Sequence, residues 1–199
     1  MRKLLAVATM AAALGINSAA QAEGSVEAGQ QKSAVCAACH GPDGNSFNPE
    51  WPSLAGQHKA YMVTQLTAFK EGRRQNELMS PMAMGLSEQD ILDLAAYYAA
   101  QKPAALEADP DLVAGGRRIY LGGDPERGVT ACIACHGPTG YGNPLAGYPV
   151  VAGQHSAYTT AALKAYADGA RHNQMMQEIA ARLAEDDIRA VSAYLQGLR

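Results

Sequence analysis

All four cysteines of this sequence belong to two copies of one short pattern. The copies are Cys36-Ala37-Ala38-Cys39-His40 and Cys132-Ile133-Ala134-Cys135-His136. Cys-x-x-Cys-His is the attachment pattern of a c-type haem, in which the two thiols add to the two vinyl groups of one porphyrin. The histidine that follows supplies a ring nitrogen to the iron as the proximal ligand. We therefore expect two covalently bound haem c groups, with His40 and His136 on the irons.

Three other chemistries can use a pair of cysteines at this spacing. A four-cysteine zinc site would need the two pairs to meet, and it would not need a histidine after each pair. A thioredoxin-like redox pair would lie in a βαβ pattern, but no strand-like runs surround the motifs. A short-range disulfide is the third alternative. The duplicated motif, together with the export signal described below, favours haem over all three.

Each iron also needs a ligand on the side opposite its histidine, and methionine is the candidate. The first half offers Met79, Met82 and Met84, whereas the second offers Met175 and Met176. At an offset of 97 residues only Met79 and Met176 fall on one another. Each lies eight residues before the predicted start of a final helix. We predict that this pair ligates iron and that the other three methionines fill gaps in an apolar core.

The elements that must position these residues also occur twice. The segment Leu54-Ala55-Gly56-Gln57-His58 aligns with Val151-Ala152-Gly153-Gln154-His155. This offset is one residue longer than that of the haem motifs, so one residue has been inserted after the second motif. An internal repeat of this length is a whole domain. We predict an all-α fold of two tandem domains, residues 23–102 and 109–199, joined by a linker at 103–108.

Capping residues and apolar spacing predict the helices. In the first half we expect one helix from Ser25 into Cys36, one over about 58–71, and a final one from Ser87. In the second half we expect one helix that starts at Asp109-Pro110 and runs to Cys132, followed by helices from about Ser156 and about Glu185. Gly72 to Gly85 is predicted to be a loop.

Two further matched pairs allow more than one interpretation. Pro52 and Pro149 each follow an aromatic residue, and either could offer its carbonyl to the haem histidine or be an ordinary loop proline. His58 and His155 follow a Gly-Gln turn. We expect them to open surface helices, with a structural or propionate-contacting role rather than a role as iron ligands.

Composition and the N-terminal segment restrict the location and the partners. Residues 1–22 have a basic start, an apolar run and an Ala20-Gln21-Ala22 cleavage site, which predicts a signal peptide and export to the periplasm. No later segment is long and apolar enough to predict a transmembrane helix. With 16 basic and 19 acidic residues the net charge is −3, and no basic patch suggests nucleic-acid binding.

Together these motifs resemble the diheme cytochromes c4 of bacterial periplasms, over the whole chain after residue 22. The resemblance rests on the paired Cys-x-x-Cys-His motifs, the paired aromatic-Pro-x-x-x-Gly-Gln segments and the methionine before each terminal helix. It implies two class I cytochrome c domains in a pseudo-twofold arrangement and His/Met ligation in each. It also implies electron transfer from a cytochrome bc complex towards a terminal oxidase, often near the membrane surface.

Two other functions are compatible with the same motifs. A cytochrome subunit of a larger oxidoreductase, such as a flavocytochrome c sulfide dehydrogenase, would have a similar sequence. A diheme peroxidase would need one iron without its methionine, which the matched pair argues against. We therefore expect an electron carrier that is not itself an enzyme.

Overall fold

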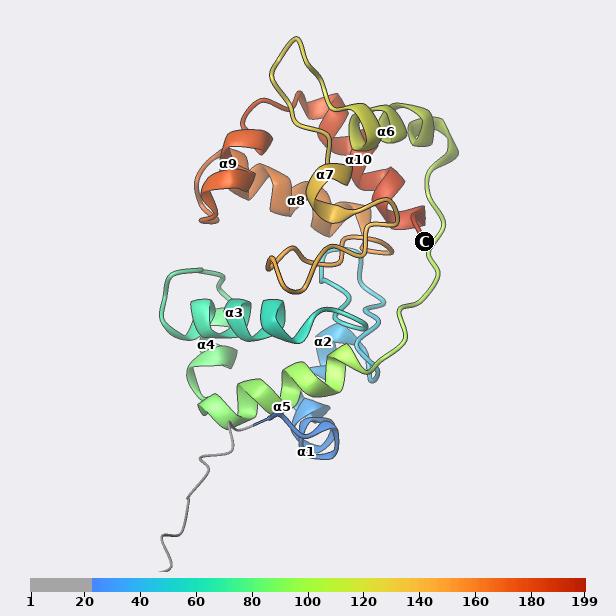
Figure 1. The fold of residues 1–199 in the computed structure, drawn as a ribbon. Helices are drawn as coiled ribbons and strands as arrows, with labels where there is room; N and C mark the ends of the chain where they lie inside the picture. The colour runs from blue at the N-terminus through green and yellow to red at the C-terminus, as the bar shows by residue number, and fades with distance from the viewer. Residues whose placement is uncertain (1–22) are drawn as a thin grey trace, which may run out of the picture.

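Eleven short helices account for the regular structure of residues 23–199, the part of the chain that the computed structural model describes (Figure 1). Residues 1–22, which carry the predicted signal peptide, lie outside it. The first half contains α1 (Val26–Lys32), the 3₁₀ turn η1 (Ser33–Val35), α2 (Ala37–His40), α3 (Lys59–Lys70), α4 (Met79–Met84) and α5 (Glu88–Ala99). The second contains α6 (Pro110–Gly122), α7 (Ile133–His136), α8 (Ser156–Ala167), α9 (Gln174–Ala180) and α10 (Glu185–Gly197).

The two halves have the same helix order and the same packing, so the predicted all-α fold of two tandem repeats is confirmed. In the first half α1 crosses α5, and in the second α6 crosses α10 (Figure 1). Both crossings are close because a glycine lies at the contact. A Cβ at Gly29 would collide with the Asp93 carbonyl oxygen, and one at Gly116 would collide with that of Ala190. A side chain at either glycine would push the helices apart.

The helix starts follow the local capping signals in the sequence. Ser25 caps α1, and Asp109 caps α6 with Pro110 in the first turn. Ser87 and Asp90 form a capping box at α5. Ala184 precedes α10 without a side-chain cap, but three acidic residues in its first turn favour that helix start through the macrodipole.

Two of the predicted elements are wrong. The helix expected to continue to Cys132 ends at Gly122, because Gly123 takes a left-handed conformation (φ +66°). The chain then turns through an antiparallel bridge between Asp124 and Val129 before it reaches the motif. The segment 72–85 is not entirely loop either, since Met79–Met84 in its second half form α4.

Each half has a small apolar core of its own. In the first, α5 contributes Leu94, Ala95, Tyr97 and Tyr98, which pack on Met62 of α3. In the second, Ile119 and Tyr120 of α6 pack on Val191 and Leu195 of α10. The cysteines Cys36 and Cys132 lie at the edges of these cores. A group attached to them would therefore extend the apolar interior.

Two glutamines at matched positions join the halves. The Gln57 side chain donates to the Val150 carbonyl (2.9 Å) and accepts from the Val150 amide (3.0 Å). Gln154 makes the same two bonds to Ser53, both 2.9 Å long. We call the boundary lined by these contacts the seam. Since the contacts come in equivalent pairs, the halves are related by an approximate twofold axis.

Candidate functional site

The first Cys-x-x-Cys-His motif forms a single helical turn. Cys36 lies at the N-terminus of α2, and its carbonyl accepts from the amides of Cys39 (3.1 Å) and His40 (2.9 Å). This turn presents both thiols and the imidazole from one short element. Gly41 then ends it in a conformation (φ +80°) that suits glycine.

The second motif repeats this geometry in α7. The Cys132 carbonyl accepts from Cys135 (3.2 Å) and His136 (2.9 Å). All four thiols are free of disulfides. In residues 23–199 no group of three or more His, Cys, Asp or Glu side chains could hold a metal ion, so the two pairs do not meet in a zinc site. The same residues form no strand beyond isolated bridges, which also removes the thioredoxin-like interpretation.

Both motif histidines are buried and held in one orientation. His40 Nδ1 donates to the Pro52 carbonyl (2.8 Å), and His136 Nδ1 donates to that of Pro149 (3.1 Å). The matched prolines therefore contact the histidines, which was one of the two interpretations of these residues. A donor bond at Nδ1 leaves Nε2 as the free lone pair. Burial lowers the pKa of both imidazoles and so favours the neutral form that can bind iron.

The matched methionines share a local arrangement that the sequence analysis did not anticipate. The amide of Met79, at the start of α4, donates to Asn76 Oδ1 (2.9 Å). The amide of Met176, in the first turn of α9, donates to Asn173 Oδ1 (3.0 Å). The asparagines also match at the offset of 97, so the signal was present in the sequence. Each fixes the backbone from which a methionine side chain leaves.

Burial separates these methionines from the others. Met79 and Met176 are half-buried, whereas Met82, Met84 and Met175 are 44, 65 and 47% exposed. An exposed thioether does not fill a core, so the gap-filling role predicted for these three is wrong.

The helices that carry the first histidine and the first methionine lie on the same side of α3. Figure 1 shows α2, which ends at His40, and α4, which begins at Met79, towards opposite ends of α3, on the side that faces α5.

The donor set fits a c-type haem in each half. Two thiols on one turn, a buried imidazole with Nε2 free and a half-buried thioether on another helix are the groups that such a haem uses. Burial raises the pKa of Cys36, and it raises that of Cys132 to about 11. These thiols remain protonated near neutral pH, which distinguishes them from metal-binding thiolates.

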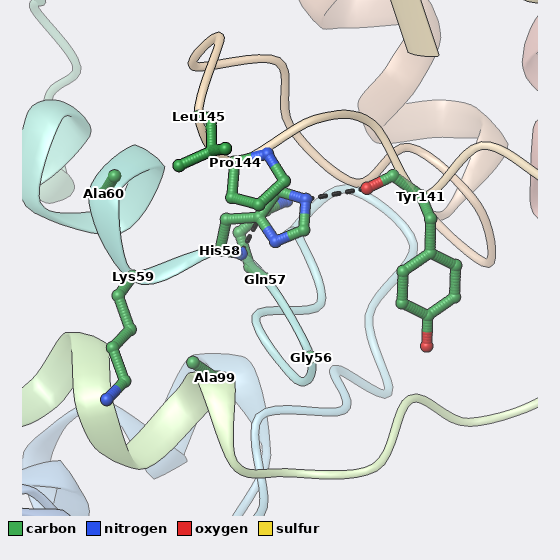
Figure 2. Close-up of a pocket in the computed structure, with 9 residues that line it drawn as sticks. All are labelled: Gly56, Gln57, His58, Lys59, Ala60, Ala99, Tyr141, Pro144 and Leu145. Atoms are coloured by element: carbon green, nitrogen blue, oxygen red, sulfur yellow. Dashed lines mark hydrogen bonds between the residues drawn. The ribbon is translucent and has the colours of Figure 1, made fainter. Parts of the chain in front are cut away.

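His58 and His155 act at the seam rather than on a free surface. Figure 2 shows the His58 ring directed at the Tyr141 carbonyl of the other half, 2.7 Å from Nε2. His155 donates in the same way to the Ser46 carbonyl at 2.8 Å and is only 8% exposed. The residues do open α3 and α8, as predicted. Their side chains are interdomain donors, so the expected surface position is wrong for His155.

A pocket of about 540 Å³ lies beside His58, between α3 and the loop that carries Leu145 (Figure 2). None of the predicted haem-binding residues lines it. On the equivalent side of the seam, the amide of Tyr158 donates to the Pro49 carbonyl (3.1 Å). A backbone hydrogen bond thus bridges the seam on that side, whereas a pocket lies on the other side, beside the loop that the inserted residue has lengthened.

Comparisons with known proteins agree with this geometry. The family described as Cytochrome c matches residues 26–101 and again 116–199. The chain is 50% identical to "Cytochrome c4" of Thiocapsa roseopersicina, over 92% of this chain and 98% of that protein. It is similar to the crystal structure of reduced recombinant cytochrome c4 from Pseudomonas stutzeri, with a TM-score of 0.85 and 44% identity over 88% of this chain and all of that one.

The name of another similar protein describes it as the electron acceptor of an enzyme. The chain is 38% identical to "Thiosulfate dehydrogenase electron acceptor" of Thiomonas intermedia (strain K12), over 98% of this chain and 90% of that protein.

Proposed function

Because this chain belongs to the cytochrome c4 family of diheme electron-transfer proteins, we propose that it carries single electrons between respiratory partners in the periplasm. Membership of the family gives it two covalently bound haem c groups. Each haem supplies one iron that gains and loses one electron. The protein contributes attachment, axial ligands and the surroundings of each iron.

The proposed ligands are His40 with Met79 in the first domain and His136 with Met176 in the second. The thioether bonds are assigned to Cys36, Cys39, Cys132 and Cys135. The observation that carries the proposal is the repeated asparagine–methionine arrangement, since the two domains use it at equivalent positions. The Pro52 and Pro149 carbonyls support the histidine assignment, because they orient each ring with Nε2 free.

This ligand set determines the class of reaction. With a histidine and a methionine both bound, a haem iron would have no open position for oxygen or peroxide. A methionine ligand raises the reduction potential relative to other axial ligands. A site with both axial positions filled suits electron exchange, so we assign a carrier rather than a peroxidase.

Domain boundaries, location and partners follow from the resemblance and the sequence. We propose that residues 1–22 are removed on export, that domains 23–102 and 109–199 each hold one haem, and that 103–108 connects them. Among residues 23–199 no helix has the length and apolar character needed to cross a membrane. The proposed donor is a cytochrome bc complex and the acceptor a terminal oxidase, with peripheral membrane association.

A second candidate is electron acceptance from a dehydrogenase that oxidises a sulfur compound. The name of the Thiomonas intermedia relative favours it, and a cytochrome subunit of a flavocytochrome c sulfide dehydrogenase belongs to the same class. Purification from its own cells separates the possibilities: a free carrier elutes alone, whereas a subunit elutes with its enzyme.

A reductive titration of the purified holoprotein tests the carrier assignment. We expect two one-electron steps and low-spin spectra in both oxidation states. Carbon monoxide should bind to neither reduced haem, and peroxide should be consumed only slowly. Rapid peroxide turnover by the wild-type protein would instead identify a peroxidase.

A further inference from the structure

The two seam glutamines bond to the same peptide groups that orient the motif histidines. In the second domain, the Pro149 carbonyl accepts from His136 Nδ1 (3.1 Å), and the Val150 amide donates to Gln57 Oε1 (3.0 Å). This carbonyl and this amide are the two ends of one peptide group. A continuous chain of hydrogen bonds therefore runs from the imidazole of His136 to the side chain of Gln57 in the first domain.

The first domain contains the same chain of bonds in the opposite direction. The Pro52 carbonyl accepts from His40 Nδ1 (2.8 Å). The amide of Ser53, which belongs to the same peptide group, donates to Gln154 Oε1 (2.9 Å). Each motif histidine is thus connected to a glutamine of the opposite domain, and neither chain of bonds is complete within one domain.

The partners of Gln57 determine which way its amide faces. A peptide N–H only donates and a peptide carbonyl only accepts, so the side-chain oxygen must face the Val150 amide and the side-chain nitrogen must face the Val150 carbonyl (2.9 Å). Gln57, Val150 and His136 are buried, with at most 9% of their surface exposed. In an interior of low dielectric constant, hydrogen bonds that are joined through one peptide group polarise and strengthen one another.

The strength of the hydrogen bond at Nδ1 affects what the imidazole can do for a bound iron. When the N–H of a peptide group donates a hydrogen bond, electron density shifts towards its carbonyl oxygen, which becomes a better acceptor. A better acceptor at Nδ1 makes Nε2 more basic and the imidazole a stronger electron donor. Such a ligand stabilises ferric over ferrous iron, so it lowers the reduction potential.

We propose that Gln57 tunes the reduction potential of the haem in the second domain and that Gln154 tunes that of the haem in the first. Each glutamine is a positioning residue that acts through a peptide group and a histidine rather than by contact with the iron. The proposal rests on the proposed function, in which His40 and His136 are axial ligands, but it does not depend on which methionines complete the sites. Each potential then depends on closure of the seam.

Loss of a glutamine acceptor and opening of the seam have opposite effects on the potentials. Without the acceptor, the hydrogen bond at Nδ1 weakens, and the potential of the haem in the opposite domain rises. An opened seam would admit water to both domains, and a more polar environment stabilises the charged ferric form. Both potentials would then fall. The sign of the change and the haem that it affects therefore separate the two roles.

The test uses the holoprotein and the variants Gln57→Leu and Gln154→Leu, since leucine is similar in size to glutamine but has no acceptor. His58→Leu is the matched control, because it removes another bond across the seam, that to the Tyr141 carbonyl (2.7 Å), and leaves both chains of bonds in place. An NMR redox titration follows the haem methyl resonances of each domain separately. The Nδ1–H resonances of the reduced protein, labelled with ¹⁵N-histidine, report the strength of each histidine bond.

We expect Gln57→Leu to raise the potential of the second haem and to move the His136 Nδ1–H resonance upfield, with the first haem and His40 unchanged. Gln154→Leu should have these effects on the first haem and His40 instead, and His58→Leu should have neither set of effects. The proposal is wrong if either glutamine variant moves both potentials together, moves only that of its own domain, or leaves both as in the wild type. The proposed function would fail separately, because the wild-type protein would then lack two one-electron steps.

Discussion

Gln57 and Gln154 occupy equivalent positions in the two domains, and each is bonded to the backbone of the other domain through both atoms of its amide. Gln57 pairs with Val150 and Gln154 with Ser53, through four bonds of 2.9–3.0 Å. This arrangement resembles a pair of strand residues, but it uses side chains. It fixes the relative orientation of the two domains, because only one orientation satisfies the hydrogen bonds of both amides.

Replacing Gln57 with Ala should loosen the seam without unfolding either domain. The change leaves the buried Val150 amide and carbonyl without partners, which costs about 1–3 kcal/mol. We expect the thermal unfolding transition, measured by calorimetry, to broaden or to split into two. Gln31→Ala, on the exposed face of α1, is the control and should keep the wild-type profile. A single unchanged transition in Gln57→Ala would show that the amide contacts do not couple the domains.

Covalent attachment predicts a fixed mass and resistance to extraction. Since Cys36, Cys39, Cys132 and Cys135 each match a thioether position, haem should remain with the chain in acidified organic solvent. The intact mass of the exported protein should exceed that of residues 23–199 by two haems. Loss of either haem to the solvent would contradict the assignment of that pair of cysteines.

Replacing Met176 with Ala should open the sixth position of the second haem alone. The weak sulfur–iron charge-transfer band should fall by about half, because two equivalent sites contribute to it. The potential of that haem should drop, and its reduced form should bind carbon monoxide. Met175→Ala, at an exposed neighbour, is the control and should change none of these. If Met175→Ala also removes half of the band, the ligand assignment is wrong.

Asn173 should matter to the second haem although it is not a ligand. Asn173→Ala removes the side-chain cap of α9, at a cost of about 1 kcal/mol, and frees the backbone of Met176. We expect a lower unfolding midpoint and faster displacement of the methionine by added cyanide or imidazole. Asn173→Asp keeps an acceptor oxygen and should restore both towards wild type. Cyanide binding at the wild-type rate in Asn173→Ala would rule out this role.

The contact between α1 and α5 should weaken in acid. Lys32 bonds to Asp93 and, together with the Ser25 amide, holds the pKa of that carboxyl at about 2 rather than 3.8. A depressed pKa stabilises the fold above pH 4, and this contribution is lost as the pH falls towards 2. Asp93→Asn should flatten the stability curve in that window. An unchanged slope in Asp93→Asn would contradict this role of the Lys32–Asp93 contact.

Local features were predictable from the sequence, and contacts between the halves were not. The caps at Ser25, Ser87 and Asp109 lie beside the helices they start, so the residue type alone identifies them. Gly123 ends α6 through a backbone conformation that its sequence position did not reveal. Gln57 bonds to a residue 93 positions away in the chain. The spacing of residues within one helix carries no information about a partner so distant in sequence.

The internal repeat is the strongest signal in the sequence for the candidate site, but it does not by itself show which other matched residues make contacts. It selected Met79 and Met176 from among five methionines. The same offset pairs Asn76 with Asn173 and Gln57 with Gln154, but these residue types are common in loops and helix ends. Their contacts become visible only when the loops and the opposite domain are placed in space.

The short segment between the domains lowers the affinity that the seam contacts need to keep the domains together. The six residues of the proposed linker, 103–108, span at most about 20 Å, so each domain would meet the other at an effective concentration in the millimolar range or above. A contact of millimolar strength between separate proteins would be mostly dissociated in a dilute solution. The same contact within this chain is mostly closed. Cleavage in 103–108 would remove this advantage, so two halves whose contact has only millimolar strength would then separate on dilution.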